Sequence, residues 1–277
     1  MNYFYAMTTI IDFHTHFFPP ELAERAITRL IENAAPTIAM KNHTNGTVGG
    51  LIESMRLGGV GKSVTLPVAT KPSQVSTINM GVAETGSIYP GIIQFGAMHP
   101  EMDGFEAEID FLSAHGIKGI KLHPEYQYSY VDDPRAFPIY EKLASAGIIV
   151  VFHSGKDPGP FTNDHALPPA LRKIHENFPT LKMVAAHLGG WMVWKEVEAT
   201  LAGLDIYFDT SAIYKLLQPN DFVRICRKHG IEKILFGSDS PWYDQGYSVE
   251  WIKRSGLNDA EIEAVFHKNA ETLLGLC

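Results

Sequence analysis

Short runs of β-branched and other apolar residues alternate with longer segments of helical character along the 277 residues of the chain. Eight of these runs are continuous and apolar, as is typical of parallel strands that are covered on both faces. The predicted strands span residues 10–13, 63–66, 91–96, 117–122, 148–152, 182–186, 206–208 and 233–236. The pattern therefore predicts an α/β protein built on a parallel sheet.

Helix signals fall between the predicted strands. Asp133 places a carboxylate before Pro134, and Asn258 is followed three residues later by Glu261, as in a capping box. The last helix carries apolar residues at helical spacing, and we expect it to pack on the outside of the sheet. These residues are Ile262, Val265, Phe266, Leu273 and Leu274.

The spacing of the repeats predicts how the strands are arranged. The seven βα steps between Asp12 and Asp239 average about 32 residues each, close to the length of a βα unit. No linker rich in Pro, Gly or Ser interrupts them. We expect a single (β/α)₈ TIM barrel over residues 1–277, with a doubly wound open sheet as the alternative. The longer, irregular segment 35–59 is expected to be a lid insertion.

Composition excludes several classes of protein. The formal net charge is −8 and no basic run is present, which argues against nucleic acids and anionic membranes as partners. Cys226 and Cys277 form no CxxC pair, so reduced thiols are expected. The first ten residues lack a secretion signal, and every apolar run is shorter than the roughly 20 residues of a membrane span. We expect a cytoplasmic enzyme that acts on a small molecule.

Polar side chains gather where the predicted strands end. Chemistry in such barrels lies at the carboxyl ends of the strands. The first predicted strand ends in the sequence IDFHTHF, and alternation along a strand predicts that its polar residues share one face. The set comprises Asp12, His14, His16, Lys121, His123, His153, His187 and Asp239.

The H-x-H pair of His14 and His16 does not by itself show a metal site, because two histidines that form hydrogen bonds to the backbone would give the same pattern. Four histidines and an aspartate at one barrel mouth are harder to explain without a metal, because burying so many unpaired polar groups costs several kcal/mol. We therefore expect a divalent metal ion at this group of four histidines, His14, His16, His153 and His187, and Asp239. Zinc suits such a histidine-rich site, and manganese is an alternative.

The sequence also resembles the amidohydrolase superfamily, in particular the amidohydrolase-related branch that includes aminocarboxymuconate-semialdehyde decarboxylase. The similar segments run from Ile11 to Leu276 and are IDFHTHFFP, GIKLHPEYQ, VFHSG, AAHLGG, FGSDSPW and KNAETLLGL. The resemblance implies that His14, His16, His153 and Asp239 are the metal ligands. It implies that His187 polarises the substrate or acts as an acid–base residue.

The number of metal ions stays open. Two-metal members of the superfamily use the counterpart of His187 as a ligand and bridge the ions with a carboxylated lysine on the fourth strand. Lys121 lies on the fourth predicted strand, where it would be carboxylated, hold a substrate carboxylate or pair with an acidic neighbour. We expect one ion, with two as the alternative, and a homodimer by analogy with related enzymes.

The expected reaction is hydrolysis of an amide, ester or lactone. A bound metal lowers the pKa of water towards about 7, Asp239 would take the water's proton, and His187 would stabilise the oxyanion. Asp12 would orient an imidazole through its second nitrogen or bond to the backbone. His123 and Trp242 are expected to contact the substrate, with ordinary loop packing as the alternative for Trp242.

Two alternatives use the same residues. One is a metal-dependent, non-oxidative decarboxylase of a small aromatic or unsaturated acid. The arginine that binds the substrate carboxylate in that family has no clear counterpart, because Arg56 lies in the helix-like sequence ESMRLGG. The other is a catalytically silent barrel, which the intact set of histidines and aspartate argues against.

Overall fold

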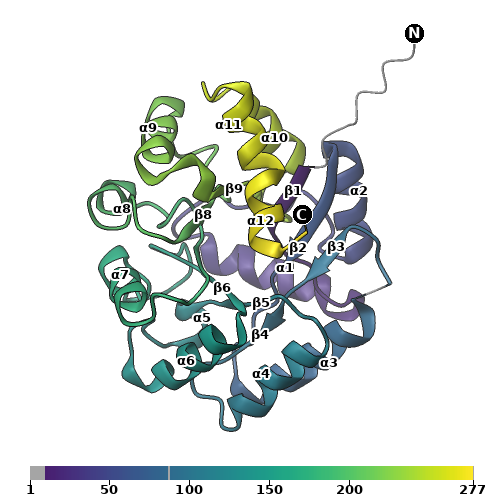
Figure 1. Cartoon of the computed structure of the whole chain (residues 1–277). Helices are drawn as coiled ribbons and strands as arrows, with labels where there is room; N and C mark the ends of the chain where they lie inside the picture. Colours follow the sequence, from purple (N-terminus) through teal and green to yellow (C-terminus); the bar gives the residue numbers. More distant parts are fainter. Residues whose placement is uncertain (1–9, 87, 277) are drawn as a thin grey trace.

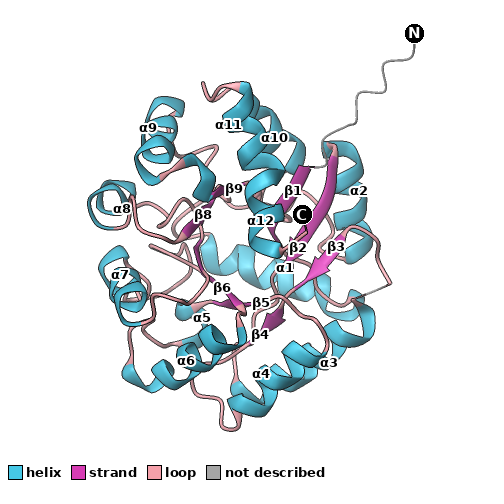
Figure 2. Cartoon of the chain, viewed as in Figure 1, coloured by secondary structure: helices cyan, strands magenta, loops and turns pink. Residues whose placement is uncertain are grey.

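Parallel strands form a closed ring at the centre of the molecule, and helices surround the ring (Figures 1 and 2). The computed structural model describes residues 10–86 and 88–276. The strands, in chain order and in the order of pairing, are β1 (Ile10–Thr15), β2 (Val60–Thr65), β3 (Ile92–Gln94), β4 (Gly96–Ala97), β5 (Gly119–Leu122), β6 (Ile149–Phe152), β7 (Met183–Ala185), β8 (Tyr207–Asp209) and β9 (Ile234–Leu235).

The ring has eight positions because β3 and β4 are the two halves of the predicted strand 91–96. The ring closes between its first and last strands, where Phe13 N donates to Phe236 O at 2.7 Å and Asp239 N donates to His14 O at 2.8 Å. All pairs are parallel, as continuous apolar strands between helices require. The predicted (β/α)₈ barrel is confirmed, and the alternative open sheet is wrong.

The helices that the structure describes are α1 (Pro20–Ala34), α2 (Val48–Gly58), α3 (Val75–Thr85), α4 (Phe105–Ala114), α5 (Pro124–Gln127), α6 (Phe137–Ala146), α7 (Pro168–Asn177), α8 (Trp194–Thr200), α9 (Pro219–His229), α10 (Gln245–Lys253), α11 (Asp259–Glu263) and α12 (Asn269–Leu274). Among them, none is both long and apolar enough to cross a membrane.

The expected lid at 35–59 divides into two parts. Its second half is α2, which packs against β2 and α10 and so belongs to the outer ring of helices. Its first half is an irregular loop beside the carboxyl ends of the strands, where Phe18 N donates to Gly46 O and His43 N donates to Pro241 O. Helix α1 crosses behind the ring in Figure 1, so α1 lies at this end together with residues 35–47.

Apolar side chains form two concentric layers. Strand residues that alternate inward fill the ring, among them Ile11, Val64, Val151, Val184 and Leu235. Their outward-facing neighbours pack against the helices in a larger outer layer. Because side chains alternate along a strand, the sequence predicts whether the side chain that follows each strand points into the ring or towards the helices.

The last helix differs from the expectation. A π-helical turn at Ala264–Lys268 separates α11 from α12 and rotates the face that the helix presents. Val265 and Phe266 lie in the outer layer as expected, but Leu273 and Leu274 pack with the inward-facing residues of the strands. Helix α12 therefore covers the end of the ring at which the strands begin, in front of the centre in Figure 1.

Candidate metal centre

A β-bulge in β1 sets the direction of the first metal-ligand candidates. Asp12 pairs with Ser63 and Thr15 with Thr65, so three steps along β1 face two along β2. As a result Phe13 and His14 both face the inside of the ring. Phe13 packs edge to face on Phe95, with 5.7 Å between ring centroids. The prediction that Asp12 and His14 share a face is wrong, because it assumed unbroken alternation.

Of the two roles expected for Asp12, the structure shows the hydrogen bond to the backbone. Its carboxylate faces the outer layer, where it accepts hydrogen bonds from Ser238 N at 2.9 Å and Gln245 Nε2 at 2.8 Å. It also accepts one from the backbone N–H of His14 at 3.1 Å. Burial raises its pKa to about 6 despite these bonds. No imidazole nitrogen within residues 10–86 and 88–276 bonds to this carboxylate, which ties β1 to the loop after β9 and to α10.

His14, His16 and Asp239 come together at the centre of the mouth. His14 Nδ1 donates to Asp209 Oδ2 at 2.8 Å, and His16 Nδ1 donates to Leu66 O at 2.8 Å, because those oxygens can only accept. In the neutral form of each ring, the lone pairs are therefore on the Nε2 atoms. They lie 3.6 Å and 3.2 Å from Asp239 Oδ1. Burial lowers the pKa of His14 to about 4, which keeps its ring neutral.

His153 and His187 lie next to this group. His153 Nε2 donates to Lys156 O at 3.0 Å, so its Nδ1 carries the lone pair, and that atom is 3.0 Å from His187 Nε2. The rings of His187 and His14 are 5.2 Å apart between centroids. Burial lowers the pKa of both His153 and His187. His153 reaches the group of His14 and Asp239 through His187 rather than by a direct contact.

Two of these residues hold unusual backbone conformations. His187 has φ 60° and Asp239 has φ 73°, in the left-handed region that side chains other than glycine seldom adopt. Each is held there by a hydrogen bond of its own N–H, from His187 N to Asp209 Oδ1 and from Asp239 N to His14 O. Such conformations cluster at functional sites.

Asp209 is the residue that sequence reasoning missed. It ends β8, one position beyond the predicted strand 206–208, and its carboxylate also accepts from Ser211 N at 3.0 Å and from Ser211 Oγ. Burial alone would raise its pKa, but the interaction with His14 and these hydrogen bonds hold it below the usual range. The signal was present in the sequence, since an acidic residue after an apolar strand matches the pattern at Asp239.

Lys121 enters the same space from β5. Its side chain is 1% exposed, and Nζ lies 3.4 Å from His14 Nε2. Burial lowers the pKa of this ammonium group to about 8. The structure therefore brings a buried lysine to the lone pair of a predicted metal ligand.

The other two predicted substrate contacts lie further out. His123 stacks in parallel on the ring of His153, with 4.2 Å between centroids. Trp242 packs against a small apolar cluster formed by Trp191, Ala212 and Tyr243. Arg56 is on the surface, where it pairs with Glu53 at 2.7 Å. Arg56 does not lie at the mouth of the barrel, which agrees with its position in a helix-like segment of the sequence.

The donor set suits a divalent cation. In neutral rings bonded through Nδ1, His14 Nε2 and His16 Nε2 have no hydrogen to donate. Both atoms nevertheless lie close to Asp239 Oδ1, at 3.6 Å and 3.2 Å. Converging lone pairs repel one another unless a positive charge lies between them. Imidazole nitrogens with a carboxylate suit zinc and manganese.

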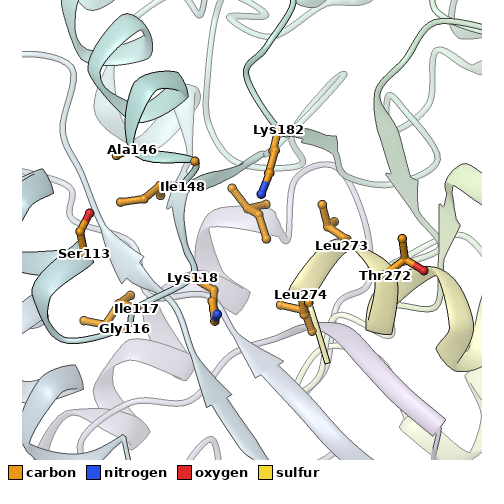
Figure 3. A pocket seen from close by; sticks show the side chains of 13 residues that line it. Ser113, Gly116, Ile117, Lys118, Ala146, Ile148, Lys182, Thr272, Leu273 and Leu274 are labelled. Atoms are coloured by element: carbon orange, nitrogen blue, oxygen red, sulfur yellow. The ribbon is translucent and has the colours of Figure 1, made fainter. Parts of the chain in front are cut away.

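A hollow at the other end of the ring has no comparable chemistry. Lys118 and Lys182 reach into it from the starts of β5 and β7, beside Leu274 (Figure 3). Helices α4, α6 and α12 end beside it, and the partial negative charge of helix C-termini favours lysines there. We therefore place the functional site at the carboxyl ends of the strands.

Comparisons with known proteins agree with this fold. An uncharacterized TIM-barrel protein from Bordetella bronchiseptica is 23% identical, covering 96% of this chain and 98% of its own, with a TM-score of 0.78. A dihydroxybenzoic acid decarboxylase from Polaromonas sp. JS666, with bound manganese and 2-nitroresorcinol, is 16% identical over 97% of each chain, with a TM-score of 0.75. The 5-carboxyvanillate decarboxylase from Sphingomonas paucimobilis is 13% identical, covering 97% of this chain and 99% of its own, with a TM-score of 0.71.

The search of curated proteins found no match. The family model described as Amidohydrolase matches residues 11–276, nearly the whole chain. The residues at the mouth of the barrel agree with the resemblance noted from the sequence motifs. The chain therefore belongs to this amidohydrolase family.

Proposed function

We propose that the protein is a metal-dependent, non-oxidative decarboxylase of a small aromatic or unsaturated carboxylic acid. The observation that supports this proposal most directly is the position of Lys121. In the part of the chain that the structure describes, no carboxylate oxygen lies within 4.0 Å of its Nζ. Such a buried ammonium group beside the metal ligands is suited to an anionic substrate and has no evident purpose for a neutral amide.

Several structures of similar fold support this choice over hydrolysis, which the sequence favoured. Those named here with a stated activity are decarboxylases of aromatic acids. Hydrolysis of an amide, ester or lactone stays an alternative, because the same histidines and aspartate would serve it. Zinc, the homodimer and the cytoplasmic location also stay predictions.

His14, His16, His153 and Asp239 would hold the ion. When bound, a divalent metal supplies a Lewis acid for the oxygens of the substrate. Lys121 binds the carboxylate that is to leave and keeps it beside His187. Asp239 takes the proton of a neighbouring hydroxyl and passes it to the carbon that bears the carboxylate. The carbon–carbon bond then breaks, its electron pair stays with the substrate, and carbon dioxide leaves.

A screen that follows two products separately tests this proposal. The protein, loaded with Mn²⁺ or Zn²⁺, is given 2,6-dihydroxybenzoate, 5-carboxyvanillate and related hydroxybenzoic acids, and carbon dioxide is measured. Lactones and amides are tested in parallel for ring opening or amine release. Carbon dioxide release that is lost on chelation supports the proposal. Hydrolysis without any carbon dioxide release would replace it with the alternative.

A further inference from the structure

The loop after β9 carries a buried tyrosine that has no role in the metal centre. A turn begins at Asp239, whose backbone oxygen accepts from Trp242 N at 2.9 Å and from Tyr243 N at 3.3 Å. Tyr243 is 8% exposed and lies in the small apolar cluster with Trp191 and Ala212. Those two residues belong to the loops after β7 and β8. Tyr243 is therefore part of the wall of the mouth on the side of β7, β8 and β9.

Contacts of its ring, and not of its hydroxyl, hold Tyr243 in place. Tyr214 meets the ring edge to face, with 5.2 Å between the centroids. Lys215 Nζ lies over the ring, 5.1 Å from its centroid, in the range of a cation–π contact. A phenylalanine ring would make each of these contacts as well. The hydroxyl is therefore not needed to position the side chain.

The hydroxyl itself lacks a partner among the described residues. Within residues 10–86 and 88–276, no group forms a hydrogen bond with Tyr243 Oη. A tyrosine hydroxyl usually finds a partner when it is buried, as Tyr140 does by donating to Val131 O at 2.9 Å. Burial and the negative charge of Asp239 raise the pKa of Tyr243, so the hydroxyl keeps its hydrogen. This side chain therefore offers an unused hydrogen-bond donor close to the charge at the mouth.

The barrel places Tyr243 across the mouth from Lys121. Strands β5 and β9 occupy the fourth and the last of the eight positions in the ring, so their carboxyl ends lie opposite each other. Lys121 lies in β5, and Tyr243 follows β9. A substrate whose leaving carboxylate is bound by Lys121 would extend across the mouth towards the loop after β9. Only a substituent on the far side of its ring, meta or para to that carboxylate, would reach Tyr243.

We infer that Tyr243 determines specificity by donating a hydrogen bond to an oxygen on the far side of the substrate ring. The inference deepens the proposed function and rests on it, because the carboxylate at Lys121 sets the orientation. It narrows the substrate class to aromatic acids with a hydroxyl or methoxy oxygen meta or para to the leaving carboxylate. An unsaturated open-chain acid has no such ring substituent.

Three acids that differ in one hydroxyl test the inference. They are 2-hydroxybenzoate, 2,4-dihydroxybenzoate, which adds an oxygen para to the carboxylate, and 2,5-dihydroxybenzoate, which adds one meta to it. With Mn²⁺-loaded protein, initial rates of carbon dioxide release give kcat/KM, and titration calorimetry gives the affinity. We expect at least one dihydroxy acid to be preferred over 2-hydroxybenzoate by about 3- to 10-fold, the effect of one hydrogen bond.

Tyr243→Phe should remove this preference and leave the affinity for 2-hydroxybenzoate unchanged. The control Tyr247→Phe removes an exposed hydroxyl of α10 and should keep the preference. A preference that survives Tyr243→Phe overturns the inference, as does the absence of a preference in the unmodified protein. An equal loss for all three acids also overturns it, because Tyr243 would then have a structural role only.

Two further outcomes are covered by the same measurements. If Tyr243→Phe fails to fold, the preferred acid is compared in the unmodified protein with its counterpart that carries a methyl group in place of the added hydroxyl. A methyl group that is bound equally well rejects the inference, and weaker binding supports it. If none of the acids releases carbon dioxide, the proposed reaction fails, but the affinities from calorimetry still decide the role of Tyr243.

Discussion

His14 Nδ1 donates a hydrogen bond of 2.8 Å to Oδ2 of Asp209, which joins β1 to β8 across the mouth of the barrel. Asp209 is held in turn by the backbone N–H groups of His187 and Ser211. This contact decides which nitrogen of His14 carries hydrogen. It therefore aims the lone pair of Nε2 at Asp239.

Replacing Asp209 by asparagine should weaken metal binding while the chain still folds. The neutral amide orients His14 less strongly, and loss of such a partner typically lowers metal affinity about 10- to 100-fold. Titration of metal-free protein with Mn²⁺ measures the change. Asp221→Asn, which removes an exposed carboxylate of α9, should leave the affinity unaltered. An equal affinity for both variants would contradict the role given to Asp209.

Asp239→Asn should abolish most of the activity. The proposed proton transfer depends on this carboxylate, and losing such a group typically costs about 10² to 10⁴ in rate. The initial rate of carbon dioxide release with saturating Mn²⁺ is the measurement, and Asp103→Asn is the control. Activity close to that of the unmodified protein would remove Asp239 from the mechanism.

Lys121→Met should lower kcat/KM for the acid substrate and leave the metal in place. A buried hydrogen bond to a charged group contributes about 1.5 to 3 kcal/mol, so a loss of roughly 10- to 100-fold is expected. Lys118→Met changes a lysine at the opposite end of β5 and is the matched control. If Lys121→Met loses metal as well as activity, Lys121 is a bridging ligand and not a substrate contact.

His187→Gln should reduce kcat more than it changes metal content. Its Nε2 faces His153 Nδ1 at 3.0 Å and is placed to stabilise charge on the substrate, an effect of about 10²-fold or more when one such donor is removed. Metal analysis beside steady-state kinetics separates the two roles. Halved metal content would show that His187 is a ligand of a second inner ion.

The contribution of Glu125 to the stability of the metal-free protein should fall as the pH rises from about 4.5 to about 7, opposite to the contribution of the buried histidines, whose pKa values burial lowers. Burial raises the pKa of Glu125 from its usual value near 4.5 to about 7, so the folded state binds the extra proton over this range. Ionising the group costs folding free energy on the order of 3 kcal/mol. Thermal melting of the unmodified protein and of Glu125→Gln at pH 5 and at pH 8 isolates this contribution. The unmodified protein should lose stability relative to Glu125→Gln between the two pH values, and an equal change in both proteins would contradict it.

Local patterns in the sequence were enough for most of the fold. Apolar runs of strand length between helix signals repeat at a regular interval, and both properties depend on neighbouring residues only. The same regularity placed His14, His16, Lys121, His187 and Asp239 at one end of the barrel. The structure brings all five together at the mouth.

Interactions between remote segments decided the rest. The bulge that separates Asp12 from His14 follows from the pairing of β1 with β2, which no single strand encodes. The π-helical turn that redirects Leu273 depends on how the last helices pack on the ring. Residues alternate along a strand whatever its partners are, but which nitrogen meets which carboxylate depends on closure of the whole ring. The sequence by itself thus determined the barrel and the kinds of ligand, and tertiary structure chose Asp209 as the partner of His14.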